Sequence, residues 1–192
     1  MDGGHGDAHD MAMDGPDWEA RIERVEAELA IRGLAARYCF AIDDHDLAAV
    51  GELFTEDARV HSKDKVMDAT GRDAILRQYE GRFASLGPSN HVSHDHAIRF
   101  GPDPDRAEGT LSAHAELLRD GVPMLTALRY ADHYDRDRGV WRFAERELSF
   151  LYYVPLADYP GILGQRDRMR AYDRPAPADY PETLPGWRDY RA

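Results

Sequence analysis

Three histidines lie close together in the segment Asn90-His91-Val92-Ser93-His94-Asp95-His96. Imidazole can take up and return a proton near neutral pH, and it is also the commonest metal ligand among side chains. On a regular strand His94 and His96 share one face and His91 lies on the other, so the three can enter one site only if the strand bulges. The segment therefore predicts either an acid–base site or a metal site.

A carboxylate follows an apolar run at Phe40-Ala41-Ile42-Asp43, and Tyr38 lies five residues before it. A carboxylate placed among apolar side chains is costly unless a hydrogen-bond donor pairs with it. A phenol can donate to an oxygen on which negative charge develops. Asp43 is therefore a candidate to orient a histidine, and Tyr38 is a candidate donor to a substrate oxygen. A helix-terminal cap is the alternative role for Asp43.

Later segments supply further polar candidates. His114 stands among small side chains, which leave space as a cavity wall would. Tyr130 and Arg146 lie on the two strands expected after it and could line the same pocket. The pair His94 and His96 has the spacing of metal ligands on a strand, and His114 or Glu116 could complete a set of three. The residues alone leave acid–base and metal chemistry open.

The composition narrows the class of protein. The chain has 192 residues, 43% of them hydrophobic, with 36 acidic and 24 basic residues and a net charge of −12. This length and composition suit one globular domain with appendages, and the negative charge argues against nucleic acid or an anionic membrane as partner. The single Cys39 excludes an internal disulfide and a cysteine-based zinc cluster. No membrane span or signal peptide is recognisable, so we expect a cytoplasmic protein.

A long helix is predicted to begin at Asp17, a favourable cap, and to run to about residue 42. Its apolar residues recur at helical spacing as one stripe: Trp18, Ile22, Val25 and Leu29, continued by Leu34 and Tyr38. A stripe of this length could also pack against another subunit.

The remaining pattern predicts an α+β fold. A short helix over 47–54 precedes a strand over 58–62, a turn over 68–71 and a helix over 74–86. Four strands follow, over 90–100, 107–118, 124–134 and 140–154, separated by hairpin turns. We expect a curved, mostly antiparallel sheet closed on one face by about three helices.

Three regions are expected along the chain. Residues 1–15 are a polar, disordered tail, residues 16–156 are the α+β domain, and residues 157–192 are an arm rich in proline and aromatic residues. The aromatic side chains of the arm need burial, so it either wraps its own domain or crosses to a neighbouring subunit.

From about Glu19 to Leu156 the sequence resembles the SnoaL-like branch of the nuclear transport factor 2-like superfamily. The segments that carry the resemblance are Arg37-Tyr38-Cys39-Phe40-Ala41-Ile42-Asp43, Leu53-Phe54-Thr55-Glu56-Asp57-Ala58, Gly71-Arg72-Asp73-Ala74-Ile75, Asn90-His91-Val92-Ser93-His94 and Tyr134 to Phe143. The resemblance implies a cystatin-like cone with an internal apolar pocket. It also implies kinship with lyases of the bile-acid 7α-dehydratase, dehydrochlorinase and scytalone dehydratase type, which use a His–Asp pair and no cofactor.

The spacing in this chain matches the dehydratase pattern, in which the tyrosine precedes the aspartate by five residues and the histidine follows it by 48. Tyr38, Asp43 and His91 reproduce both intervals. The resemblance thus implies His91 as general base, Asp43 as its partner and Tyr38 as oxygen donor. His114 falls near a second pocket histidine of scytalone dehydratase-type members. Ser62 takes the place of a pocket tyrosine.

Departures from these patterns alter the expected substrate. Dehydrochlorinases carry lysine where Tyr38 stands, and the bile-acid pattern has a second carboxylate near Ala115 that is missing here. We predict a cofactor-independent lyase or isomerase that acts on a hydrophobic small molecule and forms a homodimer or homotrimer. The alternatives are a binding or scaffold subunit similar to the small subunit of ring-hydroxylating dioxygenases, and a metal enzyme using His94, His96 and His114.

Overall fold

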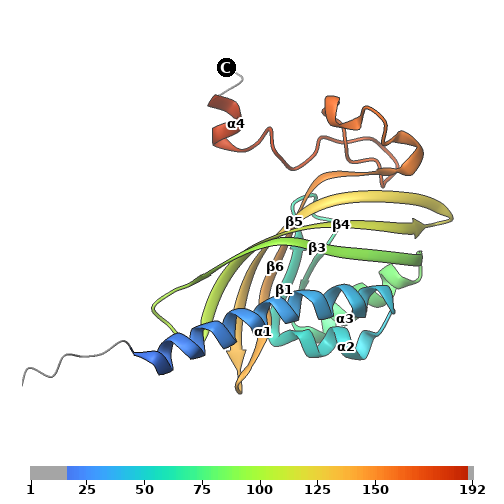
Figure 1. Ribbon diagram of the computed structural model, residues 1–192. Coiled ribbons are helices and arrows are strands. Elements are labelled where there is room, and N and C mark those ends of the chain that lie inside the picture. Colours follow the sequence, from blue (N-terminus) through green and yellow to red (C-terminus); the bar gives the residue numbers. More distant parts are fainter. Residues whose placement is uncertain (1–16, 190–192) are drawn as a thin grey trace, which may run out of the picture.

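The computed structural model describes residues 17–189, so the predicted tail over 1–15 lies outside the described residues. Three helices precede or interrupt the early strands, and four long strands follow (Figure 1). The elements are α1 (Trp18–Asp43), α2 (Leu47–Leu53), β1 (Phe54–Ser62), β2 (Asp68–Thr70), α3 (Arg72–Phe83), β3 (Leu86–Phe100), β4 (Arg106–Arg119), β5 (Val122–Asp137), β6 (Val140–Pro155) and α4 (Pro185–Asp189), with 3-10 turns at Leu156–Asp158 and Ile162–Gly164. The predicted α+β order is confirmed.

Six strands form one curved sheet in the order β2-β1-β6-β5-β4-β3. Every neighbouring pair is antiparallel except β1 and β6, which run parallel. The helices α1, α2 and α3 lie on one face of the sheet (Figure 1). Two boundaries differ from the sequence prediction: the turn expected over 68–71 contains the short strand β2, and β3 begins at Leu86 because α3 already ends at Phe83.

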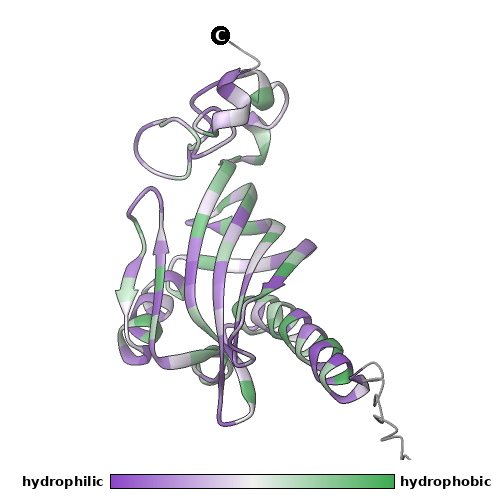
Figure 2. Cartoon of the chain, turned by 90° about the vertical axis from the view of Figure 1, so that its left-hand side faces the viewer, coloured by the Kyte–Doolittle hydropathy of each residue, from purple (hydrophilic) through white to green (hydrophobic). Residues whose placement is uncertain are grey.

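The helix α1 begins where predicted, with the Asp17 carboxylate accepting the N–H of Ala20 at 3.0 Å. Its apolar stripe is divided between two faces, contrary to the prediction of one continuous stripe. Leu34 and Tyr38 are buried against the sheet, whereas the first part of the stripe is exposed: Trp18, Ile22, Val25 and Leu29. The step of five residues from Leu29 to Leu34 turns the helix by about 140°. The first turns of α1 extend past the sheet (Figures 1 and 2).

Strand β3 contains a β-bulge, without which His91 and His96 would lie on opposite faces of the sheet. Ser93 pairs with Ala113 and His96 pairs with Leu111, so three residues on β3 span the length of two on β4. The extra residue reverses the alternation, as a bulge does. His91 and His96 therefore face the helices, and His94 points to the opposite face of the sheet.

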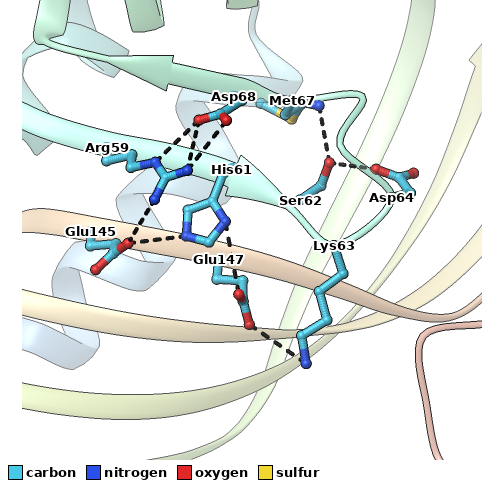
Figure 3. A network of polar contacts seen from close by, with 9 residues as sticks. All are labelled: Arg59, His61, Ser62, Lys63, Asp64, Met67, Asp68, Glu145 and Glu147. Carbon is cyan, nitrogen blue, oxygen red and sulfur yellow. Dashed lines mark hydrogen bonds and ion pairs between the residues drawn. The ribbon is translucent and has the colours of Figure 1, made fainter. Parts of the chain in front are cut away.

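Complementary charges accompany the parallel pairing of β1 with β6. Figure 3 shows Arg59 and His61 of β1 against Glu145, with His61 Nε2 3.0 Å from its carboxylate. Glu147 lies between His61 and Lys63, at 3.8 and 3.6 Å. A shift of one residue would turn these charges toward the helices, so they favour the observed register.

The arm after β6 is packed onto its own domain, one of the two predicted alternatives. Its backbone pairs with the end of β6, where the N–H of Tyr153 donates to Arg168 at 2.9 Å. Met169 is buried in the main core, and Ile162 is buried on the outer face of the sheet. Arg168 binds Glu182 within the arm at 2.7 Å. Of the aromatic side chains of the arm, Tyr180 is buried, whereas Tyr159 and Trp187 are each 39% exposed.

Candidate functional site

The carboxylate of Asp43, the last residue of α1, meets His91 of β3. Asp43 Oδ1 lies 2.6 Å from His91 Nδ1, and Oδ2 accepts the backbone N–H of the same histidine at 2.7 Å. The hydroxyl of Ser89 donates to Oδ1 at 2.7 Å. The Asp43 and His91 side chains are only 16% and 15% exposed. The helix end and the strand are thus joined by one carboxylate that accepts three hydrogen bonds.

These hydrogen bonds keep Asp43 ionised. Burial raises the pKa of Asp43, but the donors on His91 and Ser89 outweigh it and bring the pKa below its usual value. An ionised carboxylate can only accept, so in the neutral ring of His91 the proton is on Nδ1 and the lone pair is on Nε2. No residue in the range 17–189 hydrogen-bonds to His91 Nε2. This nitrogen is therefore available as a base.

His91 lines a narrow cavity of about 40 Å³ between the helices and the sheet. Tyr38, Tyr79 and Tyr130 are also in its wall, with Arg82 at its partly exposed side. The rest of the wall is mostly apolar: Ile42, Met67, Phe83, Leu86, Leu117, Leu128, Leu148 and Phe150, with Thr126 and Tyr153. A wider hollow of about 510 Å³ beside the 101–103 turn is open to solvent and contains none of the predicted site residues.

Two phenols meet in the wall of this cavity. The hydroxyls of Tyr38 and Tyr79 lie 2.8 Å apart, and both side chains are buried. Burial, with a smaller effect of Tyr38, raises the pKa of Tyr79 well above its usual value, and burial does the same to the pKa of Tyr130. The hydroxyls of Tyr79 and Tyr130 therefore remain protonated and can donate hydrogen bonds.

Arg146 lies behind these rings rather than in the cavity wall, which corrects its prediction as a pocket residue. Its guanidinium is fully buried and forms two hydrogen bonds with Asp132, both of 2.8 Å. It also lies 4.2 Å from the centroid of Tyr38 and 4.0 Å from that of Tyr130. Burial lowers the pKa of Arg146, but Asp132 outweighs it, so the side chain stays charged. Arg146 thus supports two cavity tyrosines through cation–π contacts.

The other predicted histidines lie elsewhere. His114 Nδ1 and His94 Nε2 are 2.8 Å apart on the outer face of the sheet. His114 opposes Val92, whereas His91 opposes Ala115 on the inner face. The prediction of His114 as an acid in the pocket is therefore wrong, because the sheet separates it from His91.

The predicted metal set is not assembled. His96 faces the helices and hydrogen-bonds to the Tyr134 hydroxyl at 3.0 Å, whereas His94 and His114 lie on the other face. Within residues 17–189 no three His, Cys, Asp or Glu side chains are arranged to hold a metal ion. The bulge explains the error, since on a regular strand His94 and His96 would share a face.

His96 instead ends a buried polar chain. Tyr134 donates to Asp132 at 2.8 Å, and Asp132 binds Arg146. A Cβ at Gly109 would meet His96 and Tyr134 at 3.0 Å, so a larger residue would require these two side chains to shift. Burial lowers the pKa of His96, which favours the neutral ring here.

Ser62 is buried but contributes to a turn, not to the cavity. Its hydroxyl donates to Asp64 at 2.5 Å and accepts the N–H of Met67 at 3.0 Å (Figure 3). Of the three predicted pocket residues, Tyr130 alone lines the cavity.

Sequence reasoning missed Ser89 and Tyr79 as site residues. Ser89 lies two residues before His91 on the same face, a signal that could have identified it.

The comparisons with known proteins identify the family and the fold. A family model described as a SnoaL-like domain matches residues 23–147, which contain α1 through most of β6. The chain belongs to the SnoaL-like family. The matched range includes Tyr38, Asp43 and His91 but not the arm, which is an addition to the SnoaL-like domain.

Solved structures show the same fold at low identity. LinA is 20% identical with a TM-score of 0.67, covering 72% of this chain and 95% of LinA. The hexachlorocyclohexane dehydrochlorinase LinA-type3 from Novosphingobium barchaimii is 19% identical, with a TM-score of 0.65 and coverage of 72% and 95%. A candidate scytalone dehydratase of Novosphingobium aromaticivorans is 22% identical, with a TM-score of 0.65 and coverage of 70% and 91%. Among curated protein sequences, none matches this SnoaL-like chain.

Proposed function

We propose that this SnoaL-like protein is a cofactor-independent lyase or isomerase of the dehydratase type, acting on a hydrophobic small molecule. The observation that carries the proposal is the Asp43–His91 contact in the wall of an apolar cavity. A scaffold subunit has no need of an ionised carboxylate that leaves one imidazole nitrogen free and facing a cavity. The dehydratase and dehydrochlorinase names among structures of the same fold support the same class of reaction.

In the proposed reaction His91 Nε2 removes a proton from a carbon next to a carbonyl group. The electron pair of the broken C–H bond moves to form an enolate, whose oxygen accepts a hydrogen bond from Tyr38. Asp43 stabilises the imidazolium that forms. In a dehydration, the electrons return to expel a β-hydroxyl, and the imidazolium supplies the proton with which it leaves as water. The imidazolium of His91 thus acts as the acid, the role that was predicted for His114.

The Tyr79 hydroxyl is placed to assist Tyr38. A phenol that accepts a hydrogen bond becomes a better donor, so a chain from Tyr79 through Tyr38 to the substrate oxygen would strengthen the last bond. Arg146 beneath Tyr38 adds positive charge near the same oxygen. Because the cavity has room for only a few water molecules, side chains at its partly exposed side must move when a substrate binds.

We also propose self-association through the exposed part of the α1 stripe, as a homodimer or homotrimer. Four large apolar side chains at heptad-like spacing face solvent there: Trp18, Ile22, Val25 and Leu29. Exposed apolar patches of this kind mark interaction surfaces. No helix among the described residues is long and apolar enough to cross a membrane.

The test of the reaction is hydrogen exchange, which can be measured on simple ketones while the natural substrate is still unidentified. The wild-type protein is incubated in D₂O with tetralone, decalone and their β-hydroxy derivatives, and C–H to C–D exchange and water loss are followed by mass spectrometry. We expect His91→Ala and Asp43→Asn to reduce the rate by roughly 10²–10⁴-fold while the fold is retained.

His94→Ala is the matched control, since it lies on the same strand but on the outer face. It should retain the wild-type rate. Full activity in His91→Ala, or equal losses in His91→Ala and His94→Ala, would reject the pair as catalytic.

A further inference from the structure

One arginine lines the partly exposed side of the cavity, and a second contacts a cavity residue from outside. Arg82, in the last turn of α3, lines the cavity beside Phe83 and Leu86. Its guanidinium is half-buried and forms no hydrogen bond or ion pair with any residue in the range 17–189. Arg119, the last residue of β4, lies over the ring of Tyr153, another cavity residue, with its guanidinium 5.9 Å from the centroid. Its one carboxylate contact among the described residues is with the exposed Asp120, at 3.6 Å.

The arm brings Tyr172 to the same place. The Arg119 guanidinium is 4.8 Å from the Tyr172 ring centroid. Burial and the Asp64 carboxylate raise the pKa of the Tyr172 phenol, whereas the charges of Arg82 and Arg119 lower it. Both guanidiniums are thus close enough to act on one phenol oxygen, although they come from different elements.

An unpaired, half-buried guanidinium is unexpected in this chain. The protein carries 36 acidic residues and a net charge of −12. Other partly buried arginines have an acceptor, as Arg136 has Asp105, Arg170 has Asp158 and Arg72 has the carbonyl of Phe54. A half-buried cation loses hydration, and this loss is offset only when an anion or a hydrogen-bond acceptor is present. The negative end of the α3 dipole explains a basic residue in its last turn, but not the position of that residue in a cavity wall.

We propose that the substrate carries a carboxylate on its apolar skeleton, and that Arg82 and Arg119 bind this group. The inference rests on the proposed function, because it assigns His91 and Tyr38 to the reacting end of the same molecule. A guanidinium matches a carboxylate with two parallel hydrogen bonds, and such charge-assisted bonds are the stronger ones. The two arginines would therefore orient the skeleton, with its acidic end outward and its reacting carbon toward His91.

The test uses two probes that differ only in charge, naphthylacetate and its methyl ester. Their dissociation constants are measured by isothermal titration calorimetry on the full chain. We expect the wild-type protein to bind the acid roughly tenfold more tightly than the ester, the effect of one charge-assisted hydrogen bond. Arg82→Gln should bring the two affinities together by weakening the acid alone, and Arg119→Gln should act in the same direction.

Arg138→Gln is the matched control, because Arg138 lies in the β5–β6 turn and its side chain is 93% exposed. It should leave the preference for the acid unchanged. Equal affinity of the wild-type protein for the two probes, no binding of either, or an unchanged preference in Arg82→Gln would overturn the proposal. These results need no turnover, so they are separate from the deuterium-exchange test of His91. Loss of exchange in His91→Ala with no role for Arg82 would leave the lyase proposal standing alone.

Discussion

Asp43 holds His91 at two points, because one carboxylate oxygen binds the ring at Nδ1 and the other binds the backbone N–H. The same contact fixes the end of α1 to β3, so the site and the packing of the helix depend on each other. The ring can neither rotate nor change tautomer without breaking a hydrogen bond to an ionised group. The orientation of the proposed base is therefore built into the fold before any substrate binds.

The tautomer of His91 is the first prediction. We expect the proton on Nδ1 and the lone pair on Nε2, since Asp43 accepts from Nδ1. Long-range ¹H–¹⁵N NMR of the imidazole nitrogens distinguishes the two forms. Asp43→Asn should give a mixture of tautomers, whereas Ser89→Ala, which removes only a second donor to the carboxylate, should keep the wild-type pattern. A proton on Nε2 in the wild-type protein would contradict the assignment of the base.

The acid dependence of stability is the second prediction. Hydrogen bonds lower the pKa of Asp43 below its ordinary value of 3.8. A carboxyl with a lowered folded pKa adds stability that is complete above the unfolded pKa and is lost as the pH falls through the folded one. The stability difference between the wild type and Asp43→Asn, from urea unfolding, should therefore shrink as the pH falls below 3.8. A difference that does not change with pH would show that the carboxyl is not ionised in the folded state.

Much of this arrangement could be predicted from the sequence. The resemblance to the dehydratase pattern, carried by the intervals from Tyr38 to Asp43 to His91, implied which side chains would meet. Hairpin signals indicated the later strands. His94, His96 and His114 could not be placed, because a single inserted residue in β3 reverses the faces and leaves no clear signal in residue types. Arg146 was predicted as a pocket residue for another reason. Its partner Asp132 lies on a different strand, and only the register of β5 with β6 shows that the two residues pair.

The buried ion pair of Asp132 and Arg146 gives the third prediction. Asp132→Ala leaves a fully buried guanidinium without its carboxylate, which should cost about 3–5 kcal/mol in the free energy of unfolding. The double variant Asp132→Leu with Arg146→Met removes both charges and should be more stable than Asp132→Ala. Urea unfolding measures both. A double variant less stable than Asp132→Ala would mean that the interaction of Asp132 with Arg146 contributes more free energy than burying the two charges costs.

Deletion of the arm gives the fourth prediction. Removing residues 160–192 uncovers core around Met169 and Ile162, which are 3% and 0% exposed. Burial of each such side chain contributes about 1.5–3 kcal/mol to the free energy of unfolding, so the melting temperature should fall by roughly 10 °C. Removal of residues 185–192 alone is the control, because residues 185–189 are exposed and should add little. An unchanged melting temperature and unchanged sedimentation in the longer deletion would show that the arm is not part of the folded unit.

Assembly through α1 gives the fifth prediction. Ile22 and Val25 are 57% and 58% exposed in the middle of the apolar stripe, so the packing of this chain does not account for them. If the stripe joins two or three copies, Ile22→Glu with Val25→Glu places like charges at the interface and should yield monomers in sedimentation velocity. Replacing Ile22 and Val25 should leave the melting temperature of the monomer unchanged, because neither side chain contacts the core. Glu23→Gln changes a neighbouring position off the stripe and should preserve the assembly. Sedimentation of the wild-type protein as a monomer, or of the double variant as an unchanged oligomer, would rule out this surface as the interface.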